Sequence, residues 1–271
     1  MKSLAAPVVL PNGYKQYPLQ IAGHKPTDVG KESLGVVEDG STGHLLKPLQ
    51  SKGRGEVEKA FYEEVSRTHP LLAAFLPKYY GTKRVTVNDK DVEFLVLEKL
   101  TQPFRRPSVL DVKIGYQTWE PTATPEKIER ERSKYRWGRE VGWRILGLKT
   151  YDSETAAYIS RGKAFGRTLQ PAEIPQMMKL FFGSTARSKA SIEALLQRLR
   201  RIEACFSAQS TYQIYSSSLL IMYEGDMEAD VLVDARMIDF AHIGREAAVD
   251  DNYLHGIASF IRYLQEYADS F

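Results

Sequence analysis

An acid and an amine two residues apart, in a string that predicts a β-strand, are the residues of this chain best suited to chemistry. Residues 107–115 read Pro-Ser-Val-Leu-Asp-Val-Lys-Ile-Gly, a P-x-x-x-D-x-K-x-G pattern in an apolar, β-branched context. Because strand side chains alternate between two faces, Asp111 and Lys113 share one surface. Pro107 suits the start of a strand, and Gly115 lets the chain leave it. A bare D-x-K pair is usually a surface salt bridge, but the nine-residue string is far more specific.

Two further motifs follow downstream. Residues 217–220 read Ser-Ser-Leu-Leu, and residues 238–242 read Ile-Asp-Phe-Ala-His. The three motifs occur in the order found in the inositol polyphosphate kinase family, which the chain resembles from residue 20 to its last helix. The resemblance implies transfer of the ATP γ-phosphate to a hydroxyl of a soluble inositol polyphosphate. Phosphoryl transfer requires alignment of donor and acceptor and neutralisation of charge, so cations and a metal-binding acid are the expected residues.

The resemblance also assigns the nucleotide side of the site. Lys47 would reach the nucleotide phosphates and Glu58 would pair with it, although an exposed edge lysine and a solvated helix glutamate are the alternatives for the bare residues. Backbone groups of Glu98 and Leu100 would bind the adenine edge. Asp239 would hold Mg²⁺ against the phosphates, because Mg²⁺ prefers oxygen ligands and keeps several waters. For an isolated aspartate, a turn or a helix cap is the simpler interpretation.

The implied transfer centre lies at Asp111 and Lys113. Lys113 would touch the γ-phosphate and the acceptor hydroxyl. Asp111 would orient or deprotonate that hydroxyl or hold the nucleotide ribose, and the sequence does not choose between these roles. Ser217 is the expected contributor to the metal shell, with satisfaction of neighbouring backbone groups as the alternative for it and for Ser218.

The acceptor side is expected in a basic segment. Residues 127–149 carry eight lysines and arginines and three glutamates, in a chain with a formal net charge of +3. From charge alone a solvated helix face is an equal alternative, and nucleic acid is disfavoured because its usual motifs are missing. The resemblance favours a small polyanion, bound by Arg54, Lys113, Lys127, Arg130, Lys134, Lys149 and His242. Arg130 and Glu131 stand where glutamines are usual in this family, which leaves the preferred phosphate positions open.

Composition sets broad limits on the class of protein. The 271 residues are 43% hydrophobic and 26% charged, which is typical of an ordinary globular protein. The single cysteine, Cys205, excludes an intramolecular disulfide and a cysteine-based zinc site, and fits a reducing compartment, the cytoplasm or nucleus. Residues 4–10 are apolar but too short and too interrupted by Pro7 for a secretory signal, and no run approaches membrane-spanning length. We expect a monomer.

The elements that would position these residues form two lobes of an α+β, protein-kinase-like fold with ATP between them. The chain contains neither a Walker motif nor an H-R-D loop, so it is not an ordinary NTPase or protein kinase. The amino-terminal lobe, residues 1–100, is predicted to hold one helix at 53–68, packed through Val57, Phe61 and Val65, and strands at 34–37, 44–49, 79–80, 84–87 and 92–97. The carboxy-terminal lobe, residues 101–271, is predicted to hold helices at 124–135, 171–182, 188–206 and 252–267 and strands at 107–115, 143–151, 215–223 and 231–240.

The compact stretch between Gly115 and Ser217 leaves no room for the large helical insertion of the inositol trisphosphate 3-kinases, which favours the multikinase subtype. An inositol hexakisphosphate kinase, making pyrophosphates, is the alternative within the family, and a phosphoinositide kinase activity is a side possibility. From another class, a non-catalytic scaffold that binds inositol phosphates is disfavoured by the intact Lys47, Asp111 and Asp239.

Overall fold

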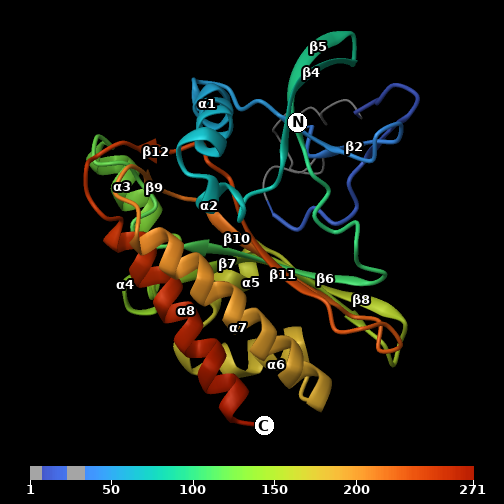
Figure 1. Cartoon of the computed structure of the whole chain (residues 1–271), viewed down its shortest axis with the longest axis vertical. Coiled ribbons are helices and arrows are strands. Elements are labelled where there is room, and N and C mark those ends of the chain that lie inside the picture. The colour runs from blue at the N-terminus through green and yellow to red at the C-terminus, as the bar shows by residue number, and fades with distance from the viewer. Residues whose placement is uncertain (1–7, 23–33) are drawn as a thin grey trace, which may run out of the picture.

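An antiparallel sheet of order β1-β2-β3-β5-β4 forms the amino-terminal lobe of the computed structural model, which describes residues 8–22 and 34–271 (Figure 1). Gly23 and His24, part of the resemblance near the start of the chain, lie outside the described residues. Two helices accompany this sheet. The elements are β1 (Tyr14–Gln16), β2 (Val37–Asp39), β3 (Leu45–Pro48), α1 (Arg54–Thr68), α2 (Pro70–Ala73), β4 (Tyr79–Val87) and β5 (Lys90–Leu97).

The hairpin of β4 and β5 turns at the predicted place. Asn88 and Asp89 both adopt positive φ, 49° and 59°, which suits a tight two-residue hairpin turn. The two short strands predicted at 79–80 and 84–87 are one strand of nine residues. The register shifts between Tyr79 and Thr82, where Gly81 has a φ of 94°, so the predicted break is a bulge within the strand.

Helix α1 confirms the helix predicted at 53–68 and the packing of Phe61 and Val65, but the prediction for Val57 was wrong. Val57 is 39% exposed, whereas Glu58 is 1% exposed and lies beside the buried Phe61, Tyr62 and Val65. Positions 58, 61, 62 and 65 follow the spacing of one helical face, and Val57 falls outside it. A carboxylate can occupy this face because Lys47 binds it.

The carboxy-terminal lobe is built on a second antiparallel sheet, of order β11-β10-β6-β7-β8. The predicted motif strand is confirmed as its central member, β6, and Gly115 ends it with a φ of 89°. Leu110, Val112 and Ile114 join the main core, while Val109 packs in a smaller cluster on the other face, as alternation requires. The strands are β6 (Pro107–Ile114), β7 (Trp143–Asp152), β8 (Ala157–Arg161), β10 (Ser218–Glu224) and β11 (Val233–Ile238).

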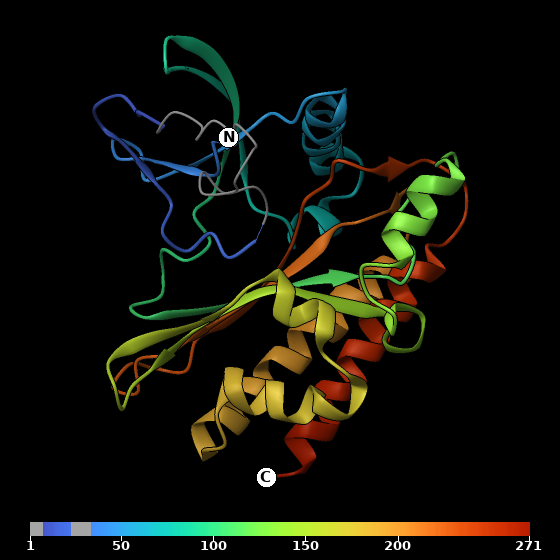
Figure 2. The same cartoon turned by 180° about the vertical axis from the view of Figure 1, so that it is seen from behind.

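Helices α6, α7 and α8 cover the face of this sheet that lies away from the amino-terminal lobe (Figures 1 and 2). The predicted helices are found with shifted ends, and Thr124 caps α3 as predicted by accepting a hydrogen bond from the Lys127 amide. Short elements that the sequence did not predict are α4, α5, β8, β9 and β12. The bounds are α3 (Pro125–Arg132), α4 (Gly138–Val141), α5 (Lys163–Thr168), α6 (Ile174–Phe182), α7 (Ala186–Ser207), β9 (Gln213–Ile214), β12 (Ile243–Gly244) and α8 (Asp251–Asp269), with a 3₁₀ turn at Pro171–Glu173.

The predicted boundary at residue 100 falls between β5 and β6, yet the two lobes share one core. The main hydrophobic cluster runs from Phe61 of α1 to Phe240 and on into α8. Residues 236–240 add polar bonds across the lobes: Arg236 donates to the Leu76 carbonyl and the Met237 amide donates to the Phe75 carbonyl. Within residues 8–22 and 34–271, no helix is both long and apolar enough to cross a bilayer.

Candidate active site between the lobes

A cavity of about 860 Å³ lies between the two sheets, and we call it the cleft. It has the size of a site for a small molecule or cofactor. Residues of both lobes line it, including the backbone segment that joins them. The predicted site residues in its wall are Lys47, Arg54, Glu98, Leu100, Asp111, Lys113, Lys134, Asp239 and His242.

Lys47 of β3 is held by two carboxylates that come from different parts of the chain. Its Nζ donates to Glu58 of α1 at 2.7 Å and to Asp239, just after β11, at 2.5 Å. Burial would lower the pKa of Lys47, but the charges of Asp239 and Glu58 outweigh it and raise the pKa well above the usual value. Glu58 also accepts the Phe240 amide at 3.1 Å. The ammonium is therefore permanently charged and fixed in position, as a group that binds phosphates must be.

Asp111 and Lys113 do not form the surface salt bridge that a bare D-x-K pair suggests. Lys113 Nζ donates instead to the carbonyl and hydroxyl of Ser216, at 2.5 and 2.6 Å. Asp111 is 4% exposed, and its Oδ1 has no hydrogen-bond partner among the described residues. Asp111 is thus buried and Lys113 half-buried in the wall of the cleft, and both can bind a ligand there.

The charges of this pair are altered by their surroundings. Burial and the nearby Asp239 raise the pKa of Asp111 to about 7. Burial lowers the pKa of Lys113 to about 8, against the opposing effect of the two aspartates. Titratable groups shifted toward neutrality in a cleft are typical of functional sites.

Two residues at the centre of the cleft have strained backbone conformations. Asp239 has a φ of 66° and Ser216 a φ of 61°, in the left-handed region that side chains rarely adopt. The left-handed Asp239 directs its carboxylate to Lys47, and the left-handed Ser216 presents both of its oxygens to Lys113. Such strain concentrates at functional sites, where the surrounding structure maintains it.

The acceptor-side residues are only partly brought together. Lys134 lines the cleft and forms an ion pair with Glu131, and His242 lines it with Nδ1 bonded to Glu120 at 2.5 Å. Lys127 is paired with Glu120 at 2.8 Å but is not in the wall of the cleft.

Three other predicted residues also lie outside the wall of the cleft. Arg130 is solvent-exposed on α3, and Lys149 donates to the Pro18 carbonyl. Ser217 is fully buried and its hydroxyl has no partner among the residues that the structure describes, while its neighbour Ser216 lines the cleft. Thus the structure does not bring Arg130, Lys149 or Ser217 to the cleft.

Three cationic residues of the cleft were missed by the sequence reasoning. Arg144 of β7 lies opposite Lys113 in the strand register, and Lys163 and Arg167 come from α5. The spacing of four between Lys163 and Arg167 was the only available signal, because a six-residue helix shows no reliable periodicity. Together with Lys134 and Arg54 these residues make the cleft strongly electropositive.

The cleft also fits a divalent cation bound together with a nucleotide. Among the described residues no group of three or more His, Cys, Asp or Glu side chains could hold a metal by itself. Mg²⁺ commonly takes only one or two protein carboxylates and completes its shell with phosphates and water. Asp239 and the unpartnered oxygen of Asp111 supply such carboxylates, and their mutual repulsion would be relieved by a cation.

A comparison with known protein families agrees with this arrangement of residues. A family model described as inositol polyphosphate kinase matches residues 94–265, more than half of the chain. The chain belongs to the inositol polyphosphate kinase family. Its matched region includes the motif strand, α3 and the segment around Asp239, so the site residues described above lie mostly within the family domain.

Relatives in the inositol polyphosphate kinase family are multikinases of animals and plants. The chain is 33% identical to the human inositol polyphosphate multikinase over 224 residues, covering 80% of this chain and 53% of that protein. It is 30% identical to the multikinase alpha of Arabidopsis thaliana over 276 residues, covering 93% and 95%. The chain spans about half the length of the animal relatives it matches and nearly all of the plant relative.

Solved structures of inositol phosphate multikinases have the same fold. The chain superposes on the Ipk2 multikinase of S. cerevisiae, determined with ADP and Mn²⁺, with a TM-score of 0.68 and 24% identity, covering 83% of this chain and 98% of that one. A second multikinase structure gives a TM-score of 0.66 and 27% identity, covering 78% and 99%. The predicted two-lobed α+β kinase fold is confirmed.

Proposed function

We propose that this protein transfers the γ-phosphate of ATP to a hydroxyl of an inositol polyphosphate. One observation carries the proposal, which is that the residues for both substrates line the same cleft. Lys47, suited to bind nucleotide phosphates, and Asp239, suited to bind the metal, lie there together with Asp111, Lys113 and the cations of the acceptor side. The yeast relative was determined with ADP and Mn²⁺, which supports a nucleotide and a divalent metal, here Mg²⁺, in the corresponding place.

The residues of this chain would share the work of transfer. Lys47 binds the nucleotide phosphates, and backbone groups of Glu98 and Leu100 bind adenine. Bound through Asp239, Mg²⁺ would neutralise charge on the phosphates. Lys113 binds the transferring phosphoryl group, and Asp111, with a pKa of about 7, orients the acceptor hydroxyl and accepts its proton, or else holds the ribose.

The acceptor is proposed to be an inositol tris- or tetrakisphosphate, as for a multikinase. Its phosphates would be bound by basic residues that line the cleft: Arg54, Lys134, Arg144, Lys163, Arg167 and His242. The alternative substrate is the hexakisphosphate, since an inositol hexakisphosphate kinase of mouse is 28% identical over 66% of this chain. We propose action in the cytoplasm or nucleus, as a monomer.

A substrate panel tests the function. The whole chain is incubated with ATP, Mg²⁺ and inositol phosphates from tris- to hexakisphosphate, and the products are separated by charge. We expect the tris- and tetrakisphosphates to be phosphorylated faster than the hexakisphosphate. Predominant pyrophosphorylated products would favour the hexakisphosphate kinase instead, and no product with any member would favour the scaffold.

A further inference from the structure

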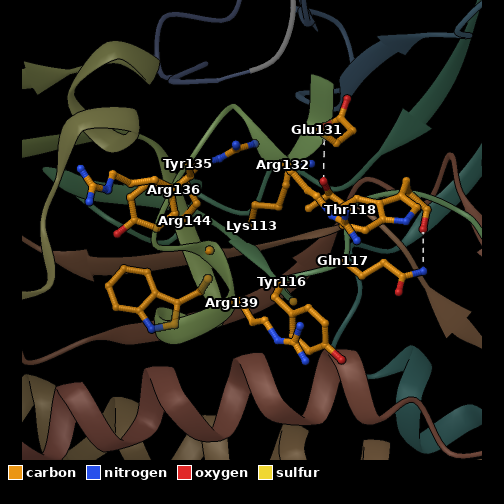
Figure 3. Close-up of a pocket in the computed structure, with 14 residues that line it drawn as sticks. Lys113, Tyr116, Gln117, Thr118, Glu131, Arg132, Tyr135, Arg136, Arg139 and Arg144 are labelled. Atoms are coloured by element: carbon orange, nitrogen blue, oxygen red, sulfur yellow. Dashed lines mark hydrogen bonds between the residues drawn. The ribbon is translucent and has the colours of Figure 1, made fainter. Parts of the chain in front are cut away.

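A second cavity, of about 430 Å³, borders the cleft, and we call it the arginine cavity (Figure 3). Lys113, Glu131 and Arg144 line both cavities and form the wall between them. The rest of the arginine cavity comes from the loop after β6, from α3 and from the segment 135–143. Its volume is within the range of sites for small molecules.

Positive charge dominates this cavity. Five cationic side chains line it, Lys113, Arg132, Arg136, Arg139 and Arg144, against the single carboxylate of Glu131. That carboxylate is already engaged by Lys134 and by the Thr118 hydroxyl. None of the four guanidinium groups has a carboxylate partner within the part of the chain that the structure describes. Arg132 and Arg136 rest on the rings of Trp119 and Trp137, which fixes their position without neutralising them.

Two buried hydrogen-bond donors belong to residues that line this cavity, Arg144 and Trp143. The Nε of Arg144 and the indole Nε1 of Trp143 are buried and have no acceptor among the described residues. Trp143 is 1% exposed, so water does not readily satisfy its N–H group. Buried donors of this kind are rare, and each one calls for an acceptor. A ligand that supplies several negative oxygens would bind the guanidinium groups of the lining together.

We propose that the arginine cavity is a second ligand site, for a small polyphosphorylated anion, next to the transfer centre and separate from the acceptor position in the cleft. Figure 3 shows Arg132 and Tyr135 on one side of Lys113 and Arg139 and Tyr116 on the other, so that charges surround the space rather than spread over a flat face. A ligand with one negative charge would leave most of this positive charge uncompensated. An anion with several phosphates matches it.

Calorimetry of the whole chain with inositol hexakisphosphate as the probe, without nucleotide, tests this proposal. We expect two binding events in the unaltered chain, one in each cavity. The double variant Arg136→Gln and Arg139→Gln is expected to weaken one event by about tenfold or more, because each charge-assisted contact is strong. The matched control is Arg200→Gln with Arg201→Gln, which removes the same charge from the exposed surface of α7 and lines neither cavity.

The outcomes separate this site from the proposed function. If the cleft binds no inositol phosphate but the inference holds, the unaltered chain shows one event, and the Arg136 and Arg139 variant loses it. If both variants bind as the unaltered chain does, the inference is wrong, whatever the kinase assay shows. Citrate is the control for ligand chemistry. If citrate binds as tightly as the hexakisphosphate, and the Arg136 and Arg139 variant weakens both equally, the assignment of a phosphate ligand is wrong. Thermal unfolding of each variant verifies that it is folded.

Discussion

Lys113 is the residue on which the proposed chemistry depends most directly. Its ammonium is held by two neutral oxygens of Ser216 and has no carboxylate partner within residues 8–22 and 34–271, so it can turn to a ligand at small cost. Burial lowers its pKa to about 8, which leaves the amine mostly protonated at neutral pH, and binding of an anionic phosphoryl group would favour the charged form further.

The substitution Lys113→Met should therefore reduce mainly kcat. An interaction with the transferring group strengthens in the transition state, and removal of one such preorganised group costs about a hundredfold or more in comparable sites. Steady-state kinetics with ATP and an inositol trisphosphate measures this, with the KM for ATP as the internal control. Retention of kcat with a raised acceptor KM would mean that Lys113 only binds substrate.

A second single-residue substitution, Asp239→Asn, tests the proposed metal-binding carboxylate. Asparagine keeps the shape of the side chain and tolerates the left-handed backbone at this position, and Lys47 retains Glu58 as a partner. We expect turnover to be abolished with a nearly unchanged melting temperature. Activity close to that of the unaltered chain would remove Asp239 from the site.

Helix α3 differs from the sequence expectation in which of its cations face the site. Lys127 and Lys134 were both predicted to bind substrate phosphates, because the resemblance to the family implies this role at both positions. They lie seven residues apart, but α3 ends at Arg132, so the turn that follows, and not the helix, places Lys134 in the cleft. Where a short helix ends depends on tertiary packing, which a single sequence does not reveal.

We accordingly expect different effects from two matched substitutions. Lys134→Ala should raise the acceptor KM about tenfold or more through loss of a charge-assisted contact, with little change in the KM for ATP. Lys127→Ala should raise it less, because Lys127 is bonded to Glu120 outside the cleft wall. Kinetics of both variants on an inositol trisphosphate decide the matter. Equal increases would show that the bound state recruits Lys127.

The strands were more predictable than the site geometry. Alternation of side chains placed β6 and the shared face of Asp111 and Lys113 correctly, because this pattern depends only on local sequence. The sequence could not show that Ser216, and not Ser217, lines the cleft. This placement depends on a left-handed turn at a non-glycine residue. The pair of Lys47 and Glu58 that the resemblance implied is present, but the burial of Glu58 on the packed face of α1 was not foreseen.

At the scale of the whole molecule, an ion pair joins α1 to the far end of the chain. Arg245 binds both carboxylate oxygens of Glu64, which also accepts the Tyr212 hydroxyl at 3.0 Å. The hydrogen bond from Arg245 lowers the pKa of Glu64 from 4.5 to about 2. The contact therefore stabilises the folded chain above pH 4.5, and that contribution is lost as the pH falls toward 2.

Glu64→Gln should lower the melting temperature near neutral pH and lose this difference in acid. Thermal unfolding of the unaltered chain and the variant between pH about 6 and about 2 gives the comparison. Glu266→Gln serves as the control, because its partner Arg262 lies one turn away on the same helix and links no distant elements. If the difference in melting temperature between the Glu64→Gln variant and the unaltered chain does not vary with pH, the carboxylate charge is not responsible.

The segment 236–240 has one more consequence, which concerns the edge of the larger sheet. Strand β11 is an outer strand of that sheet, and an outer strand with unused backbone groups invites pairing with other molecules. Here the amide of Met237 is taken up by the Phe75 carbonyl of the other lobe. The amino-terminal lobe thus acts as a cover for β11. Conditions that separate the lobes would expose the unpaired edge of β11. We therefore expect heated protein to aggregate once its lobes separate.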